Sequence, residues 1–306
     1  MTEQDRFLLS DADSERIFRE RIVPDQLTGT QQDHPAAVFV AGQPGDGKAG
    51  VTGLVQATLA ERGRPVVLSA TILEAYHPRL HEPITDDRTT ADRYVEADGL
   101  RWLARAEDHV IQQRCDVVVE TEVADPEAFA ASAAAFKAAG YHVEVAILAV
   151  HEAHSRLGVL QRHLRALEAF GFGRLVTQSR HDAGYAGVLR AAELIDAGDW
   201  ADRVGVLRPD GQLIYGNERA GAWQQPARTA DAITWERERT WTVPESRDFL
   251  DATSAVERFG LSAPVQWIRD EGVDGAKALM ALAKPRLDPV AVTLHIAKAG
   301  TSFSRY

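Results

Sequence analysis

The chain has 306 residues, of which 45% are hydrophobic, so it can bury one large α/β core and still carry a substantial appendage. Its formal net charge of −11 argues against a general nucleic-acid or anionic-membrane surface, because either surface would need a basic face. The lone cysteine, Cys115, excludes an intramolecular disulfide. Together with a polar N-terminus and no apolar stretch of membrane-spanning length, it predicts a soluble cytoplasmic protein.

The first half of the chain alternates between helical and apolar segments. An amphipathic helix over 11–24 precedes the apolar run Ala36–Val40, which predicts a buried strand followed directly by a glycine-rich turn and a helix. Val66–Leu68 is a second short apolar run without alternation, typical of a parallel strand that is buried on both faces. The polar stretch 74–91 predicts a surface loop or lid, and a long helix is expected from about Thr90 to Arg114.

The alternation continues through the second half. Val117–Val119 is the third predicted strand. The elements expected after it are a helix over 126–139, a strand over 143–150, helices over 151–169 and 180–197, and two short strands over 203–207 and 212–215. This spacing predicts the α/β class, with a parallel sheet flanked by helices.

The composition changes near residue 217. Residues 218–245 are rich in Arg, Glu, Thr and Pro and lack long apolar periodicity, whereas 246–297 predict three or four short helices. We therefore predict a core over 1–217, followed by a linker and a helical C-terminal extension over 218–306.

The glycine-rich turn matches the pattern Gly-x-x-x-x-Gly-Lys of a phosphate-binding loop. In such loops the backbone N–H groups and the helix N-terminus hold phosphates, and Lys48 would reach the outer ones. The predicted ATP-binding residues are Gly42, Gln43, Pro44, Gly45, Asp46, Gly47, Lys48 and Ala49. The full pattern ends in Ser or Thr, whose hydroxyl holds Mg²⁺, so Ala49 removes that ligand. Mg²⁺ held by the nucleotide and water remains compatible, since this ion keeps several waters in most sites.

Charged side chains near predicted strand and helix ends are further candidates. Glu120 ends a predicted parallel strand, where such sheets bind ligands, and a contact to substrate or metal is favoured there. Arg162 and Arg174 are candidates to neutralise a transferring phosphate, because phosphoryl transfer depends mainly on positioning and charge neutralisation. A solvated helix face is the better interpretation for Arg156 and Arg165.

Motifs along most of the chain match one family. The matching residues are Gly42-Gln43-Pro44-Gly45-Asp46-Gly47-Lys48, Ala75-Tyr76-His77-Pro78, Trp102, Val119-Glu120, Leu157-Gly158 through Arg162, Arg174, and His181-Asp182 with Tyr185. In this order, over about residues 11–217, they resemble the zeta toxins, which are similar to small-molecule kinases of the P-loop class. The resemblance implies ATP- and Mg²⁺-dependent phosphorylation of a UDP-activated amino sugar, chiefly UDP-N-acetylglucosamine, and inhibition by a small helical antitoxin.

The same resemblance implies roles for single residues. Lys48 would bind the β- and γ-phosphates, and Arg162 and Arg174 would stabilise the transferred group. Glu120 would hold the sugar nucleotide. The residues that we also place on the substrate side are Glu122, His77 and Ser69; no metal ligand is assigned with certainty.

The chain departs from the family at its proton-transfer position. The family usually carries Asp-x-Asp after the second strand, whereas this chain has Ser69-Ala70-Thr71, and a threonine at 71 cannot accept a proton at neutral pH. General-base catalysis is typically worth about 10²–10⁴-fold in rate. Three interpretations therefore stay open: a zeta-type kinase, a pseudo-kinase that binds nucleotide or sugar nucleotide without transferring phosphate, and a protein-interaction module that uses the helical tail.

Overall fold

The structure is a computed structural model that describes residues 8–80, 90–170 and 176–302. Its contacts divide the chain into two compact units. The sheet unit comprises Met1–Gln43, Gly47–Ala149 and Val176–Ile233, and the helical unit comprises Pro44–Asp46, Val150–Leu175 and Thr234–Tyr306. This division differs from the predicted boundary after residue 217, because the helix that follows the fourth strand groups with the C-terminal helices.

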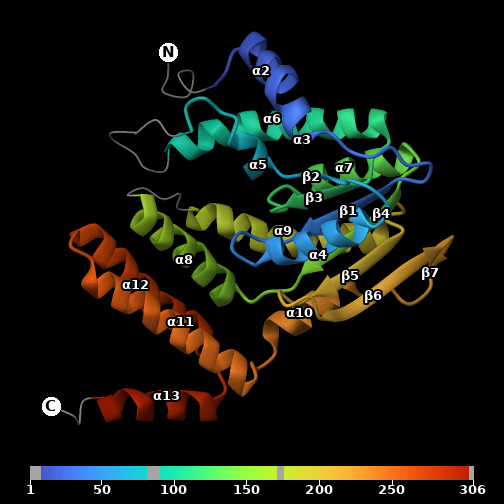
Figure 1. Cartoon of the computed structure of the whole chain (residues 1–306). Helices are drawn as coiled ribbons and strands as arrows, with labels where there is room; N and C mark the ends of the chain where they lie inside the picture. The colour runs from blue at the N-terminus through green and yellow to red at the C-terminus, as the bar shows by residue number, and fades with distance from the viewer. Residues whose placement is uncertain (1–7, 81–89, 171–175, 303–306) are drawn as a thin grey trace. The chain divides into compact units, whose positions relative to one another are not determined.

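A seven-stranded sheet in the order β2-β3-β1-β4-β5-β6-β7 forms the sheet unit (Figure 1). The parallel strands are β1 (Ala36–Ala41), β2 (Val66–Leu68), β3 (Val117–Thr121), β4 (His142–Leu148) and β5 (Arg203–Leu207). The antiparallel strands are β6 (Leu213–Ala220) and β7 (Ala222–Trp223). The predicted parallel sheet is confirmed for five strands. The sixth runs antiparallel because the tight turn at Gly211, with φ of +85°, reverses the chain directly after β5.

Helices cover this sheet and account for stretches that the sequence suggested were irregular. They are α2 (Asp11–Ile17), the π-helical η1 (Phe18–Ile22), α3 (Val23–Gln26), α4 (Lys48–Ala60), α5 (Ala70–Glu74), α6 (Thr90–Gln113), α7 (Pro126–Ala138), α9 (Gln178–Ala197) and α10 (Thr229–Glu238). The stretch 218–245, predicted as a linker, holds β7 and α10, whose first residue Thr229 bonds to Asp196. That long-range anchor leaves no periodic signal in the sequence.

Strand β1 is buried along its whole length. On one face, the Phe39 ring meets Phe129 and Phe136 of α7 edge-on, with centroids 5.6 and 5.8 Å apart. Because side chains alternate along a strand, Val38 and Val40 face the other side, where α4 packs. Burial on both faces explains the continuous apolar run in the sequence.

The helical unit contains α8 (Glu152–Phe170), α11 (Val243–Ser262), α12 (Gln266–Ala283) and α13 (Pro289–Ser302). Helices α11 and α12 lie side by side (Figure 1). They approach at Gly260 and Gly272, where a Cβ on Gly260 would lie 2.9 Å from the Cα of Gly272. Trp241, Phe249 and Leu164 belong to a separate apolar core of this unit. Three C-terminal helices are thus present, longer than the short ones predicted.

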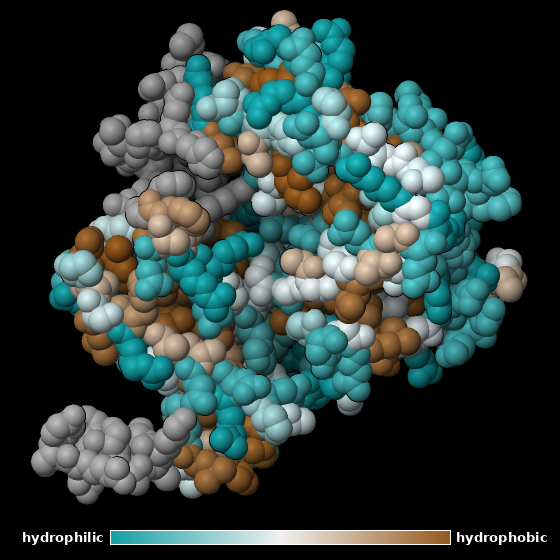
Figure 2. Space-filling view, viewed as in Figure 1, coloured by the Kyte–Doolittle hydropathy of each residue, from teal (hydrophilic) through white to brown (hydrophobic). Residues whose placement is uncertain are grey.

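Among the described residues, no helix has the length and apolar character needed to cross a membrane. The face shown in Figure 2 is largely hydrophilic, with apolar side chains in small patches. Large exposed apolar side chains such as Leu54, Leu213 and Trp235 lie on different elements, as is common on protein surfaces.

Candidate functional site

The predicted order of strand, glycine-rich turn and helix is present at residues 36–60. Strand β1 ends at Ala41 and α4 begins at Lys48. Between them, Gly45 and Gly47 have φ of +81° and +92°, conformations that favour glycine. The N–H of Gly42 donates to the carbonyl of Thr121 at 3.2 Å, which ties the start of the loop to the end of β3. The turn thus leads from a buried strand into a helix N-terminus, whose partial positive charge suits phosphate.

Lys48 lies across this loop. Its side chain is buried, with 6% of the residue exposed, and its Nζ donates to the carbonyl of Gln43 at 2.8 Å. A buried ammonium held by a backbone carbonyl can exchange that acceptor for a phosphate oxygen, to which it bonds more strongly. Asp46, whose carboxylate would repel phosphate if it faced the ligand, is buried at 3% exposure. The loop residues therefore fit a nucleoside triphosphate.

The tip of the loop packs on α8 within the helical unit. A Cβ added to Gly45 would lie 2.1 Å from the carbonyl oxygen of Ser155, and one added to Gly158 would lie 2.3 Å from the carbonyl oxygen of Gly45. Both positions therefore need glycine, which gives Gly158 of the matched motif a physical reason. Arg162 follows one helical turn later, about 6 Å along the same face of α8.

One hydroxyl and one carboxylate meet beside the loop. Thr52, in the second turn of α4, donates from Oγ1 to Oε2 of Glu120 at 2.7 Å. Glu120 pairs in register with Val40 of β1, so it stands at the C-terminal edge of the sheet next to the loop strand. The part of the chain that the structure describes holds no cluster of three or more His, Cys, Asp or Glu suited to a metal. A Mg²⁺ that keeps its waters and uses the nucleotide's oxygens fits this donor set better than a full protein cage does.

Glu122, two residues on, is engaged by a different helix. Arg180 of α9 donates to Oε2 of Glu122 from Nε and Nη2 at 3.0 and 2.8 Å, and its Nη1 lies 2.7 Å from Oε2 of Glu96 on α6. Val123 follows with φ of +45°, a strained value for a β-branched residue. Its carbonyl oxygen lies 1.9 Å from where a Cβ on Gly187 would stand. The chain after β3 is thus held in an unusual conformation by α9.

The segment Ser69–Glu74 offers little for proton transfer. Ser69 caps α5, its Oγ accepting from the N–H of Ile72 at 3.1 Å. Thr71 is exposed in the first turn of that helix. Glu74 is 1% exposed and packs on Gly99, so it faces α6 rather than solvent. The position expected for a base therefore presents a hydroxyl, and the nearby carboxylate is buried.

His77 is a structural residue in this geometry. Its side chain is fully buried, and Nε2 lies 3.3 Å from Oδ2 of Asp98. The N–H of Arg79 donates to Nδ1 at 3.2 Å, so Nε2 carries the proton that Asp98 accepts. Asp98 also accepts from the N–H of Leu9 at 3.0 Å, which joins three segments of the sheet unit. A contact between His77 and substrate stays a prediction, and the burial counts against it.

The arginines differ in their surroundings. Arg162 and Arg165 are both exposed on α8. Arg156 is half-buried and pairs with Glu152 one turn earlier, at 2.7 Å. Arg174 lies outside the described residues. The roles of Arg162 and Arg174 at the transferred phosphate stay predictions.

Two histidines anchor the start of α8. The ring of His154 lies 4.0 Å from that of Trp241, and His151 lies 5.4 Å from the same ring. Burial lowers the pKa of both histidines to about 4, and Arg286 and Arg237 add to the effect at His151. Both are therefore neutral at physiological pH and act as aromatic packing groups.

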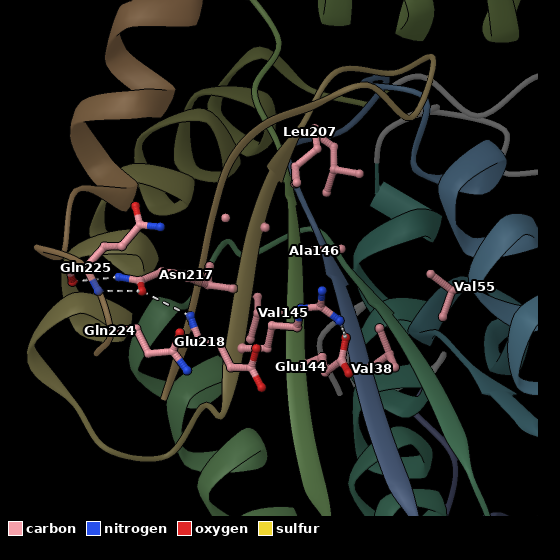
Figure 3. A pocket seen from close by; sticks show the side chains of 15 residues that line it. Val38, Val55, Glu144, Val145, Ala146, Leu207, Asn217, Glu218, Gln224 and Gln225 are labelled. Atoms are coloured by element: carbon pink, nitrogen blue, oxygen red, sulfur yellow. Dashed lines mark hydrogen bonds and ion pairs between the residues drawn. The ribbon is translucent and has the colours of Figure 1, made fainter. Parts of the chain in front are cut away.

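A hollow of about 420 Å³ lies away from the loop, over β4, β5 and β6. Figure 3 shows Val38 and Val55 on one side of it, and Asn217, Glu218 and Gln224 on the other. Asn217 closes that side by donating to the carbonyl of Gln225 at 2.9 Å. This hollow contains none of the predicted site residues.

The sequence did not point to Arg180 or Glu96. Arg180 directly precedes the matched pair His181-Asp182, and that adjacency was the only available signal. Its pairing with Glu122 spans 58 residues of sequence, and no local pattern carries such information.

Comparison with known proteins agrees with this geometry. A sequence model of the zeta toxin family matches residues 20–220. A structure from the PezAT chromosomal toxin-antitoxin system of Streptococcus pneumoniae is similar with a TM-score of 0.70 and 15% identity, covering 84% of this chain and 100% of that one. The AvrRxo1-ORF1:AvrRxo1-ORF2 structure with sulphate ions has a TM-score of 0.47 and 15% identity, covering 93% and 85%. At 15% identity, the Streptococcus pneumoniae structure shows a shared fold and nothing further. A search of the curated proteins found no match.

Proposed function

Because the chain belongs to the zeta toxin family, we propose that it is an ATP-dependent kinase of small molecules, whose acceptor is a UDP-activated amino sugar such as UDP-N-acetylglucosamine. The observation that carries this proposal is the loop from Gly42 to Lys48. Its two positive-φ glycines and buried lysine form a phosphate cradle at the start of α4.

The chain's residues divide the work as follows. The loop backbone and Lys48 hold the β- and γ-phosphates, and Arg162 and Arg174 neutralise the group in transfer. When bound, Mg²⁺ would neutralise charge on the phosphate oxygens, and Glu120, which pairs in register with the strand before the loop, would accept hydrogen bonds from its waters. Glu120 is also the residue that the resemblance assigns to the sugar nucleotide. The acceptor hydroxyl attacks the γ-phosphorus, the bond to the ADP oxygen breaks, and the hydroxyl proton passes to water, since residue 71 is a threonine.

A second function is favoured by that threonine. With Thr71 exposed and Glu74 buried, no carboxylate of α5 is placed to accept the proton. A pseudo-kinase that binds nucleotide and sugar nucleotide would need the loop and Glu120 but no base. We rank it second because losing a general base slows a loose phosphoryl transfer without abolishing it.

We also propose an antitoxin-like protein partner and a cytoplasmic location. The similar Streptococcus pneumoniae structure comes from a toxin-antitoxin system, which supports a protein inhibitor for this chain as well. ATP and UDP-sugars are cytoplasmic metabolites, and a kinase that uses both would act where they occur.

Turnover tests the proposal. The purified chain is incubated with ATP, Mg²⁺ and a panel of UDP-sugars, while ADP release and new phosphosugars are followed. We expect slow, sugar-dependent ADP release that disappears in Lys48→Ala and falls in Arg162→Ala. Arg165→Ala is the matched control, since Arg165 is also exposed on α8. Nucleotide binding without turnover above the Lys48→Ala background would reject the kinase in favour of the pseudo-kinase.

A further inference from the structure

The two glutamates at the end of β3 are turned toward different helices. Glu120 accepts a hydrogen bond from Thr52 of α4, whereas Glu122 is held by Arg180 of α9. In a regular strand these residues would share one face, but β3 ends at Thr121 and Val123 takes a positive φ. The break in the strand lets the two carboxylates serve different sides of the site.

Helix α4 ties Glu120 to the nucleotide side. Lys48 and Thr52 lie one turn apart, so they share a face of this helix. Both are buried, with 6% and 7% of the residue exposed, and α4 packs on β1 and β3. A bond from Thr52 therefore holds the Glu120 carboxylate against the helix that starts at the phosphate loop.

The hydroxyl of Thr52 has a local alternative that it does not use. A helical threonine commonly donates to the carbonyl four residues earlier, as Thr58 of the same helix does to Leu54 at 3.0 Å. Thr52 reaches β3 instead, across 68 residues of sequence, with a short 2.7 Å bond to a carboxylate. Such a bond orders an otherwise rotatable glutamate and leaves its Oε1 with no hydrogen bond from the described residues.

We propose that Thr52 is a positioning residue, which fixes Glu120 so that Oε1 accepts a hydrogen bond from a water bound to the nucleotide's Mg²⁺. The hydroxyl that Ala49 removes from the loop is thus replaced one turn later, acting through a carboxylate and a water rather than on the metal directly. This inference rests on the proposed function, because it requires ATP at the loop.

The test compares the affinity for ATP with and without Mg²⁺, measured by calorimetric titration. The variants are Thr52→Val, which keeps the shape and loses the hydroxyl, Thr52→Ser, which restores it, and Thr58→Val as the matched control on the same helix. We expect Thr52→Val to weaken Mg²⁺·ATP binding about 5- to 10-fold, the size of one lost charge-assisted hydrogen bond, with metal-free ATP binding within twofold of wild type. Thr52→Ser and Thr58→Val should match wild type.

A second measurement separates positioning from folding. In urea unfolding, Thr52→Val, Glu120→Gln and the double variant should show coupled effects on stability, while Mg²⁺·ATP binding should be weakened by the same factor in all three. Equal weakening of metal-bound and metal-free ATP by Thr52→Val, or no weakening, overturns the inference and leaves the proposed function intact. Loss of UDP-N-acetylglucosamine binding alone also overturns it, by assigning Glu120 to the acceptor. A wild-type chain that binds no ATP overturns both proposals.

Discussion

The phosphate loop follows β1 and the start of α5, Ser69–Thr71, follows β2 of the same sheet, yet the two segments tolerate sequence change differently. The loop works mainly through its backbone: two glycines at positive φ, a helix N-terminus and one lysine. The start of α5 would have to work through a side chain, and the residue at the position expected for the base is Thr71. Backbone geometry survives substitutions nearby, whereas proton transfer depends on a single group.

By this contrast, a chain with the family's fold can keep a well-formed phosphate loop whatever group stands at position 71. Ala49 removes a hydroxyl from the loop but leaves its turn intact, since α4 still begins at Lys48. Ser69 still caps α5. Both turns are therefore well formed, and the difference between them lies in reactive groups rather than in folding.

The largest expected effect comes from crowding the loop. Gly45→Ala combines a φ of +81° with a Cβ that would stand 2.1 Å from the Ser155 carbonyl oxygen. We expect ATP affinity to fall at least about 100-fold and stability to fall by about 2–4 kcal/mol, measured by titration and urea unfolding. The control is Gly53→Ala on α4, where an added Cβ meets nothing within 4 Å. This substitution should raise the free energy of unfolding by about 0.5–1 kcal/mol, because alanine favours a helix more than glycine does. Unchanged binding in Gly45→Ala would show that the loop's backbone does not hold the nucleotide.

Restoring the base is the next test. Thr71 is exposed in the first turn of α5, so an aspartate fits there. Its negative charge would be stabilised by the N-terminus of the helix. We expect Thr71→Asp to raise turnover at least about 10-fold, near the lower end of the effect of general-base catalysis. Thr71→Asn, whose side chain has the shape of aspartate but cannot accept the proton, should leave turnover unchanged. Equal turnover in the two variants would mean that the lack of a proton acceptor at position 71 does not limit the reaction.

Acid should loosen the helical unit, on which the loop tip packs, while sparing the sheet unit. His151 and His154 have a pKa lowered to about 4, so their stabilising effect is complete above pH 6.5 and is lost as the pH falls toward 4. Glu107 of α6 has a pKa raised by burial to about 7, so acid favours its native protonated form. We expect the helical unit to lose about 2–4 kcal/mol between pH 7.5 and 4.5, seen as faster amide exchange in α8 and α11 than in α6. Faster exchange in α6 would contradict this.

The smallest effect concerns the metal. Ala49 is exposed, so Ala49→Ser adds a hydroxyl without crowding. We expect it to strengthen Mg²⁺·ATP binding about threefold in the wild-type background, and more in Thr52→Val, where no other hydroxyl acts. Calorimetric titration with and without Mg²⁺ measures both. An equal gain in the two backgrounds would mean that Thr52 has no part in metal binding.

Much of the fold follows from sequence pattern. Continuous apolar runs such as Val117–Val119 correctly predicted strands buried on both faces, and the two strands expected over 203–207 and 212–215 are present as β5 and β6. The stretch 218–245 was misjudged because α10 depends on Asp196, which lies 33 residues before Thr229. Local periodicity cannot report an anchor at that distance.

The site was less predictable. The glycine spacing indicates a phosphate loop because the conformation of this turn depends on residues that are adjacent in the sequence. The partners of Glu120 and Glu122 were not foreseeable, since α4 and α9 meet β3 only after the chain has folded. His77 appeared to be a loop residue available to substrate, and only the fold shows that it is buried with its Nε2 beside the carboxylate of Asp98.

The central claim is that the loop from Gly42 to Lys48 holds a nucleoside triphosphate even though the base position is altered. Its most direct test is calorimetric titration of ATP with Mg²⁺ into the wild-type chain and into Lys48→Ala, with the exposed Lys277→Ala as the control. The claim predicts saturable binding by wild type and by Lys277→Ala, and at least about tenfold weaker binding by Lys48→Ala. Equal binding by all three chains, or no binding by wild type, would contradict it.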